Sequence, residues 1–312
     1  MKLNLQAKRK GQINIVLHDQ NNAVQPKDYH HFANRQSDHL FQFIDQAFAS
    51  YIGMEKLKST IKEIYANVVV NRKREEAGLK TEHQMLHMLF KGNPGTGKTS
   101  IAREIAKLFY QMNILSKGHF IEAERADLVG EYIGHTAQKT RDLIKKALGG
   151  VLFIDEAYSL GRGGEKDFGK EAIDTLVKHM EDYHQDFVLI LAGYPDEMDH
   201  FLYLNPGLKS RFPIVVEFRD YSVDELLDIA HIITERKQYE LTKSAADKLR
   251  YHLIHVQKNQ HTNFSNGRYV RNKVEEAIRR QALRLVATDK YGAKDLVSIK
   301  PEDFVLKDDS FS

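Results

Sequence analysis

The strongest chemical signal in the sequence is a glycine-rich run with a lysine and a threonine at its end, Gly92-Asn93-Pro94-Gly95-Thr96-Gly97-Lys98-Thr99. This run matches the phosphate-binding P-loop pattern in full. Its glycines allow backbone N–H groups to converge on an anion without a Cβ in the way. We expect Lys98 to reach the β- and γ-phosphates of a nucleotide as the only positive charge there, and the Thr99 hydroxyl to bind Mg²⁺.

The residues on either side of this run predict the two elements that a P-loop requires. An apolar strand is expected over residues 86–90, and an amphipathic helix is expected over residues 99–112. The helix N-terminus would add unpaired donors and the positive end of its dipole to the phosphate site. The alternative, a glycine-rich turn that binds nothing, is disfavoured by this context.

A second signal is a pair of carboxylates, Asp155-Glu156, that follows the wholly apolar run Val151-Leu152-Phe153-Ile154. Such a run is typical of a strand buried within a parallel sheet, and its end lies where open α/β folds bind ligands. We expect Asp155 to hold Mg²⁺ through its water shell, and Glu156 to polarise the water that attacks the γ-phosphate. Taken alone, the pair would describe a strand that runs into an exposed turn; downstream of a P-loop it favours a hydrolytic site.

The elements that must position these residues alternate between strands and helices. Further apolar runs predict strands at 120–123, 187–192 and 214–218, so residues 46–218 are expected to form a doubly wound, mostly parallel α/β sheet. After this region the pattern is helical only: a capping box at 222–225 opens one helix, and a later helix carries an apolar face. We therefore expect a smaller all-helical lid domain over residues 219–312, and a polar extension without an assigned role over residues 1–45.

Composition excludes several classes of function. The chain has 312 residues, enough for two domains, with 42% hydrophobic and 29% charged residues. Its 46 basic and 43 acidic side chains give a net charge of +3, which offers no electrostatic reason to expect nucleic acid as a partner. The absence of cysteine removes thiolate metal sites and thiol nucleophiles. No glutamate follows His83 to make a zinc-protease pattern with His87, and the pair His252/His255 lacks a third ligand.

The apolar runs of the sequence indicate where in the cell the protein is expected. None approaches the roughly 20 residues that would be needed to span a bilayer, and the N-terminus has no apolar segment typical of a secretory signal. We therefore expect a cytoplasmic protein without membrane insertion.

The P-loop, the Asp-Glu strand and the helical lid together resemble the AAA+ ATPases. Further runs resemble the branch of this family that contains the CbbX-type rubisco activases: Asp127-Leu128-Val129-Gly130-Glu131-Tyr132-Ile133-Gly134-His135-Thr136, Asp155-Glu156-Ala157-Tyr158-Ser159-Leu160, Ala192-Gly193-Tyr194-Pro195-Asp196-Glu197-Met198 and Asn205-Pro206-Gly207-Leu208. The resemblance covers about residues 45 to 305.

The resemblance implies that the nucleotide is ATP and assigns roles around it. Ile52-Gly53 would flank the adenine, and the P-loop contacts would continue through Ser100. Arg211 lies where these ATPases carry an arginine finger for the neighbouring subunit, and Arg268 resembles the sensor-2 arginine that couples the lid to the nucleotide. Without the family, Arg211 would be an ordinary exposed arginine and Arg268 a surface charge at a helix start. Tyr194 stands where many members have a water-positioning asparagine.

The resemblance also implies a ring of six copies with a central pore. The segment Tyr132-Ile133-Gly134 resembles the loop that faces this pore, where an aromatic ring can press against many polypeptide side chains without reading their sequence. Read without the family, Tyr132 is a half-buried loop tyrosine.

The predicted function is therefore an ATP-dependent, protein-remodelling ATPase that hydrolyses ATP at subunit junctions of a homo-hexamer and acts on a protein substrate. Within the branch, the resemblance favours a role in bacterial sporulation. Three alternatives remain open: a nucleotide-gated binding switch with little hydrolysis, a nucleic-acid-dependent motor, and a remodeller of the rubisco-activase type. Glu156, a water-activating carboxylate, disfavours the binding switch, and the balanced charge disfavours the nucleic-acid-dependent motor. For the rubisco-activase type, the sequence does not locate a sugar-phosphate site.

Overall fold

The computed structural model describes residues 41–82, 84–132, 134–162, 167–259, 264–288 and 291–306. Most of the extension predicted over residues 1–45 lies outside these residues, as does Ile133 of the predicted pore loop. Residues 41–47 are helical. In the described part of the chain, no helix combines the length and the apolar character that crossing a membrane requires.

A five-stranded, wholly parallel sheet forms the centre of residues 46–218, as the sequence predicts. The strands are β1 (Met88–Gly92), β2 (Phe120–Ala123), β3 (Val151–Ile154), β4 (Val188–Gly193) and β5 (Ile214–Phe218). Their order is β2-β3-β4-β1-β5, so β1 lies between β4 and β5. The strand ends that carry the P-loop and the carboxylate pair therefore meet at one edge of the sheet.

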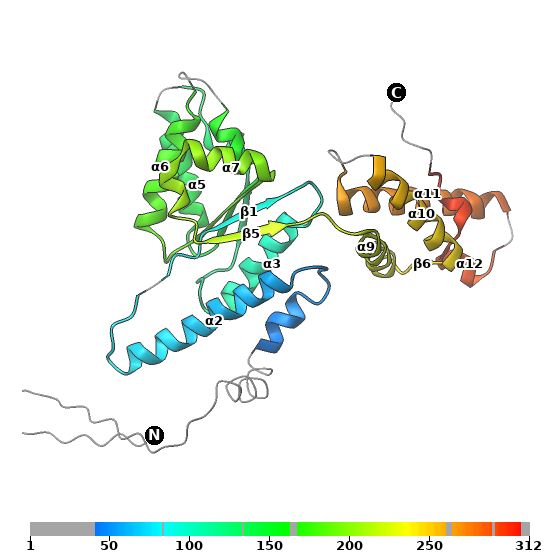
Figure 1. Ribbon diagram of the computed structural model, residues 1–312, viewed down its shortest axis with the longest axis horizontal. Helices are drawn as coiled ribbons and strands as arrows, with labels where there is room; N and C mark the ends of the chain where they lie inside the picture. The colour runs from blue at the N-terminus through cyan, green and yellow to red at the C-terminus, as the bar shows by residue number, and fades with distance from the viewer. Residues whose placement is uncertain are drawn as a thin grey trace, which may run out of the picture. The chain divides into compact units, whose positions relative to one another are not determined.

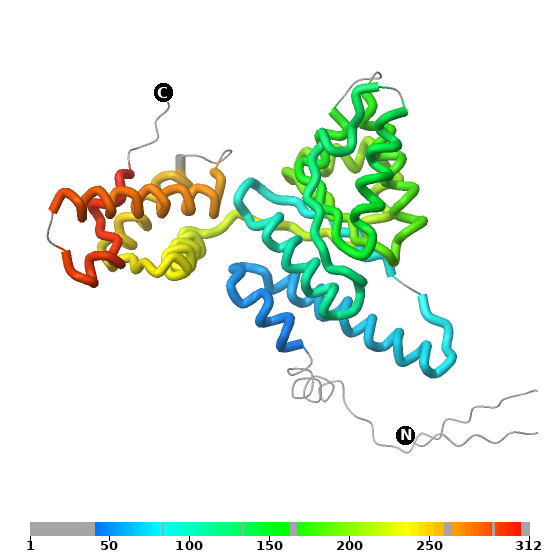
Figure 2. The backbone as a smooth tube through the Cα atoms, turned by 180° about the vertical axis from the view of Figure 1, so that it is seen from behind, coloured from blue at the N-terminus to red at the C-terminus, as the bar shows by residue number. Residues whose placement is uncertain are grey.

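Helices cover both faces of this sheet. Figure 1 shows α5, α6 and α7 grouped on one side and α2 and α3 on the other, and Figure 2 shows the same division from behind. The bounds are α2 (Glu55–Glu76), α3 (Lys98–Gln111), α4 (Arg125–Leu128), α5 (His135–Ala147), a 3₁₀ turn η1 (Ala157–Gly161), α6 (Gly169–Asp182), α7 (Pro195–Leu204) and α8 (Pro206–Lys209). Because both faces are covered, every residue of β3 and β4 is buried.

His87, just before β1, is a structural residue in the fully buried core. Its Nδ1 accepts a hydrogen bond from the Leu189 backbone N–H at 3.0 Å, so its Nε2 donates to the Met180 carbonyl at 3.2 Å. Burial lowers the pKa of His87 to about 4. The imidazole is therefore neutral in the folded protein and joins α6 to β4.

This burial makes stability depend on pH. In the unfolded chain His87 has its ordinary pKa of 6.5 and takes up a proton as the pH falls below that value. In the folded chain His87 takes up the proton only near pH 4. The free energy of unfolding should therefore fall by about 3 kcal/mol between pH 6.5 and pH 4 from this residue alone. Denaturant titrations across that range should show a flatter pH dependence for His87→Gln, whose amide can replace both hydrogen bonds. The same replacement at the exposed His200 is the control, and an identical pH dependence in both variants would contradict the prediction.

The C-terminal domain is helical, with one addition that the sequence analysis did not predict. Its elements are α9 (Val223–Arg236), α10 (Lys243–Asn259), α11 (Asn266–Thr288), α12 (Ala293–Val297) and a 3₁₀ turn η2 (Pro301–Asp303). The predicted capping box is present, since Ser222 and Glu225 bond each other's backbone N–H groups. The addition is a short parallel pair, β6 (Glu240–Leu241) with β7 (Ser298–Ile299).

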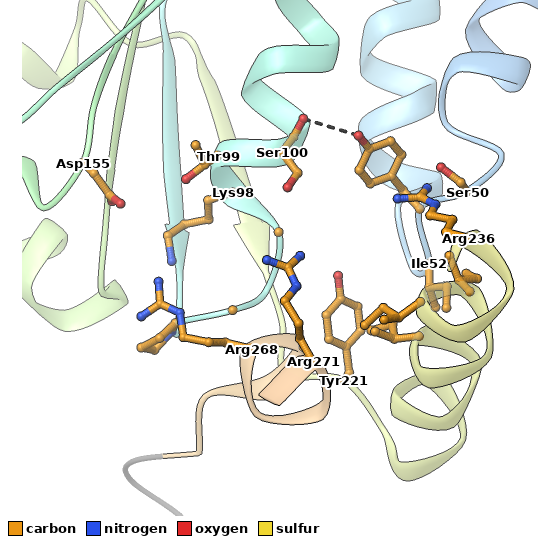
Figure 3. A pocket seen from close by; sticks show the side chains of 18 of the residues that line it. Ser50, Ile52, Lys98, Thr99, Ser100, Asp155, Tyr221, Arg236, Arg268 and Arg271 are labelled. Atoms are coloured by element: carbon orange, nitrogen blue, oxygen red, sulfur yellow. Dashed lines mark hydrogen bonds between the residues drawn. The ribbon is translucent and has the colours of Figure 1, made fainter. Parts of the chain in front are cut away.

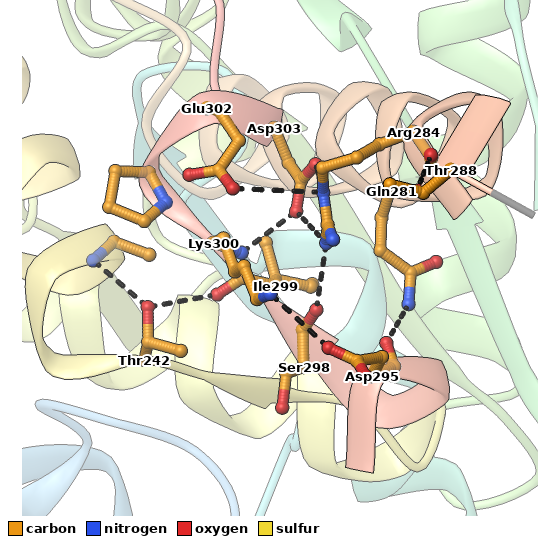
Figure 4. A network of polar contacts seen from close by, with 12 residues as sticks. Thr242, Gln281, Arg284, Thr288, Asp295, Ser298, Ile299, Lys300, Glu302 and Asp303 are labelled. Atoms are coloured by element: carbon orange, nitrogen blue, oxygen red, sulfur yellow. Dashed lines mark hydrogen bonds and ion pairs between the residues drawn. The ribbon is translucent and has the colours of Figure 1, made fainter. Parts of the chain in front are cut away.

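A polar cluster ties the segment after α11 back onto that helix (Figure 4). Arg284 makes a two-pronged ion pair with the buried carboxylate of Asp303, at 2.8 and 2.9 Å. The Lys300 backbone N–H also donates to Asp303, and Gln281 donates to the carbonyls of Asp295 and Leu296. A bidentate pair of this kind fixes geometry as well as charge. The cluster therefore sets the position of β7 and η2 on the lid.

Candidate active site

The P-loop connects the last residue of β1, Gly92, to the first residue of α3, Lys98. Two of its glycines adopt left-handed backbone conformations, with φ of +71° at Gly95 and +99° at Gly97. At Gly95 a side chain is also excluded by space, because a Cβ there would lie 2.1 Å from the Ser265 carbonyl oxygen. The loop is thus pressed against the start of the lid.

Lys98 lies at the mouth of the loop in a half-buried position. Its ammonium donates to the carbonyls of Gly92 at 2.7 Å and Asn93 at 2.9 Å. Burial lowers its pKa, the Asp155 carboxylate raises it, and the Arg268 guanidinium lowers it. The side chain therefore stays close to the loop and within electrostatic reach of both residues.

Asp155 and Glu156 follow β3 directly. The Asp155 backbone N–H donates to the Ala123 carbonyl at 3.1 Å, which extends the pairing with β2 by one residue. Glu156 then takes a left-handed conformation, with φ 46° and ψ 43°, and its N–H donates to an Asp155 carboxylate oxygen at 3.0 Å. A non-glycine residue in this region is uncommon. This bend places both carboxylates in the same pocket as Lys98 and Thr99.

The pocket has a volume of about 350 Å³, which is in the usual range for small-molecule sites. Ten of the predicted site residues line it: Ile52, Pro94, Gly95, Gly97, Lys98, Thr99, Ser100, Asp155, Glu156 and Arg268. Gly53, Gly92, Asn93 and Thr96 do not. Thr96 is buried and donates to the Asn93 carbonyl at 2.8 Å, and Asn93 donates to both carboxylate oxygens of Asp220 at 3.0 Å. Asn93 and Thr96 therefore shape the loop and the neighbouring turn.

One end of the pocket is apolar. Ile52 lines it together with Tyr51 and three isoleucines of α9, Ile229, Ile232 and Ile233. A flat aromatic base fits such a surface, whereas phosphates fit the opposite, glycine-lined end.

Three arginines line the pocket in addition to Lys98, and of these the sequence analysis predicted only Arg268. Figure 3 shows Arg268 and Arg271 pointing into the pocket from α11, and Arg236 beside Ile52 at the apolar end. Arg271 follows Arg268 by three residues and so shares its helix face, a signal that could have identified it. Arg236 is the last residue of α9, and no sequence motif marks it.

Arg211 lies apart from this pocket and is not among its lining residues. Its guanidinium forms an ion pair with Glu181 of α6 and donates to the Gly207 carbonyl. Its Nε is buried and has no hydrogen-bond partner in the described part of the chain. Arg211 is therefore held by Glu181 and Gly207 and lies outside the pocket of its own chain.

The two tyrosines singled out in the sequence occupy different environments. Tyr194 lines the pocket at the end of β4, with its ring 5.8 Å from that of Tyr158. Tyr132 is 65% exposed, and its ring lies 5.5 Å from that of His135, the first residue of α5, whose N-cap Gly134 has φ +82°. The structure therefore places Tyr194 at the pocket and Tyr132 at the surface before α5.

Two domain families match the chain in the order that the fold shows. Residues 88–220 match the ATPase family associated with various cellular activities (AAA), and residues 222–311 match the AAA lid domain. The chain belongs to the AAA ATPase family and is an ATPase.

Similar proteins cover nearly the whole chain. Stage V sporulation protein K of Bacillus subtilis (strain 168) is 57% identical over 310 residues, covering 97% of this chain and 96% of that protein. A chloroplastic ribulose bisphosphate carboxylase/oxygenase activase of Cyanidioschyzon merolae is 44% identical, covering 85% of this chain and 90% of that protein. Protein CbbX of Cereibacter sphaeroides is 43% identical, covering 84% and 85%. These matches confirm the resemblance to the CbbX branch.

Proposed function

We propose that this chain is an ATP-driven, protein-remodelling motor that works as a ring of six copies. The observation that carries the proposal is the composition of the pocket. Residues 46–218 supply Lys98, Thr99, Asp155 and Glu156, and the lid, residues 219–312, supplies Arg268 and Arg271. A ligand held by both parts makes the lid position depend on the state of the nucleotide.

The donor set fits a magnesium nucleotide. Thr99 offers a hydroxyl oxygen and Asp155 a carboxylate, and both are hard oxygen ligands of the kind that Mg²⁺ takes. Thr99 and Asp155 would hold the Mg²⁺, which would supply positive charge to neutralise the phosphates during hydrolysis. Lys98 would bind the same phosphates, and Ile52 would contact the adenine.

Glu156 would accept a hydrogen bond from the water that attacks the γ-phosphorus. The bond from phosphorus to the bridging oxygen then breaks, and ADP and phosphate leave. Arg268 would bind the γ-phosphate from the lid, and Tyr194 would help to position the water. Loss of the γ-phosphate would remove the contact between Arg268 of the lid and the nucleotide.

Arg211 would complete the site of the neighbouring copy. Because Arg211 does not line the pocket of its own chain, it would stabilise transition-state charge at the pocket of the neighbouring copy. Tyr132, Ile133 and Gly134 would face the pore of the ring, where the exposed tyrosine grips a polypeptide.

The substrate would be a protein, and the process bacterial sporulation in the cytoplasm. The match to stage V sporulation protein K leaves only about 3% of this chain unmatched, so it includes most of the first 40 residues as well as both domains. The second candidate is a rubisco activase, which the 44% identical chloroplastic relative favours. Stimulation of ATP hydrolysis by ribulose bisphosphate would select that candidate.

A Glu156→Gln variant tests the proposal, because it should bind ATP and fail to hydrolyse it. In ATP it should elute with the mass of six copies and bind a permanently unfolded polypeptide such as casein. Adding Tyr132→Ala should abolish casein binding and leave the mass unchanged, since the exposed ring is removed without touching the pocket. Tyr203→Ala, which removes a tyrosine that is 81% exposed on α7, is the control. A single-copy mass, or casein binding that survives Tyr132→Ala, would refute the ring or the pore role respectively.

A further inference from the structure

The carbonyl groups of three successive P-loop residues accept hydrogen bonds from residues that lie outside residues 46–218. Asn266 Nδ2 donates to the Pro94 carbonyl at 3.4 Å, and the Gly267 N–H donates to the Gly95 carbonyl at 3.1 Å. The Tyr221 hydroxyl donates to the Thr96 carbonyl at 2.9 Å. Asn266 and Gly267 begin α11, and Tyr221 lies in the linker between β5 and α9.

These contacts fix the direction of the N–H groups that follow. In a planar trans peptide, the carbonyl of one residue and the N–H of the next point in opposite directions. Holding the carbonyls of Pro94, Gly95 and Thr96 toward the lid therefore turns the next three N–H groups, those of residues 95–97, toward the opposite side. In the part of the chain that the structure describes, none of these N–H groups donates to a protein acceptor.

Asn266 is the centre of this arrangement. It is fully buried and adopts a left-handed conformation with φ +45°, which asparagine tolerates better than most residues. Its Oδ1 accepts from the Tyr221 backbone N–H at 3.0 Å, and its Nδ2 donates to the Asp220 carboxylate at 2.7 Å. Asp220 also binds Asn93 of the P-loop. One side chain thus joins the loop, the linker and the first turn of α11.

Tyr221 is suited to the same task. Burial raises its pKa to about 12, so its hydroxyl keeps its proton and donates throughout the neutral range. Its ring packs in the lid core, which fixes the hydroxyl relative to α9 and α11.

We propose that Asn266 and Tyr221 are positioning residues that orient the backbone N–H groups of the P-loop toward the β-phosphate of the bound nucleotide. Asn266 does not line the pocket and acts through the Pro94 carbonyl. Tyr221 lines the pocket and acts through the hydrogen bond from its hydroxyl to the Thr96 carbonyl. The affinity of the P-loop for phosphate then depends on the position of the lid, even without a contact between an arginine of α11 and the nucleotide. This inference requires the ATP site of the family and does not depend on the ring or the pore.

The test compares nucleotides with and without a β-phosphate. Tyr221→Phe removes one hydroxyl and keeps the ring, and Asn266→Gly removes the side chain while allowing the positive φ. Tyr221→Phe should raise the Kd of ADP about tenfold, as expected for losing one oriented hydrogen-bonding contact. Asn266→Gly removes several hydrogen bonds and should raise that Kd at least as much. The Kd of AMP, measured by competition against a fluorescent ADP analogue, should change by less than about twofold.

Controls separate positioning from general damage to the lid. Tyr269→Phe removes a lid hydroxyl that bonds His252, and Gln281→Leu removes a buried lid amide far from the P-loop. Both should leave the ratio of the two Kd values unchanged. If Asn266→Gly does not fold, Tyr221→Phe decides alone. Equal losses for ADP and AMP, or no loss for either, would overturn the inference.

Discussion

Replacing Lys98 by alanine should weaken the binding of ATP by at least about a hundredfold and that of ADP, which lacks the γ-phosphate, by at least about tenfold, and ATP hydrolysis should become undetectable at ordinary nucleotide concentrations. A charge-assisted contact to a phosphate contributes about 1.5–3 kcal/mol, and Lys98 would make such contacts with two phosphates. The apolar end of the pocket and the arginines remain, so residual binding through the base is expected. Isothermal titration with each nucleotide measures the loss.

The matched control for this variant is Lys107→Ala. Lys107 lies on the same helix, α3, but is exposed and pairs with Glu104 at 3.0 Å. Its removal should leave nucleotide affinity at the wild-type value. Unchanged ATP affinity in Lys98→Ala, with thermal unfolding like that of the wild type, would contradict the P-loop assignment.

Replacing Arg211 by alanine should leave ATP binding intact and slow hydrolysis by roughly a thousandfold, which is the lower end of the range for arginine fingers. The physical reason is that Arg211 lies outside its own pocket and would act on charge that develops only in the transition state of a neighbouring site. Steady-state phosphate release and nucleotide titration together separate the two effects.

Mixing experiments make the shared site testable. Lys98→Ala copies retain Arg211, and Arg211→Ala copies retain a complete P-loop. Random mixing at equal amounts should give about one working junction in four, so turnover should rise well above that of either variant alone. Arg103→Ala, which removes an exposed arginine paired with Glu122, should hydrolyse ATP normally by itself. Failure of every mixture to recover activity would exclude a junction completed by Arg211.

The sequence predicted those parts of the fold whose signals are local. β2, β3 and β5 match the predicted bounds, while β1 and β4 begin and end one or two residues later, because apolar runs locate strands better than their ends. The P-loop and the Asp155-Glu156 pair were predictable because each follows a buried strand and carries its own residue pattern.

The unpredicted features depend on contacts between distant parts of the chain. No sequence pattern identifies Asn266 as a residue that contacts the P-loop, yet its amide reaches Pro94, 172 positions away. The pairing of β6 with β7 joins Glu240 to Ser298, and two residues per strand are too few to show a period. Arg236 ends an ordinary amphipathic helix, and only the folded chain shows that it lines the pocket.

The linker between β5 and α9, residues 219–222, has a mechanical consequence. Asp220 is bonded to Asn93 and Asn266, and Tyr221 is bonded to Thr96 and to Gln257 of α10. Because this linker is short and hydrogen-bonded at both residues, it is stiff. A displacement of the lid that follows hydrolysis would therefore have a nearly constant amplitude, and a force that resists movement of the lid would act directly on the P-loop.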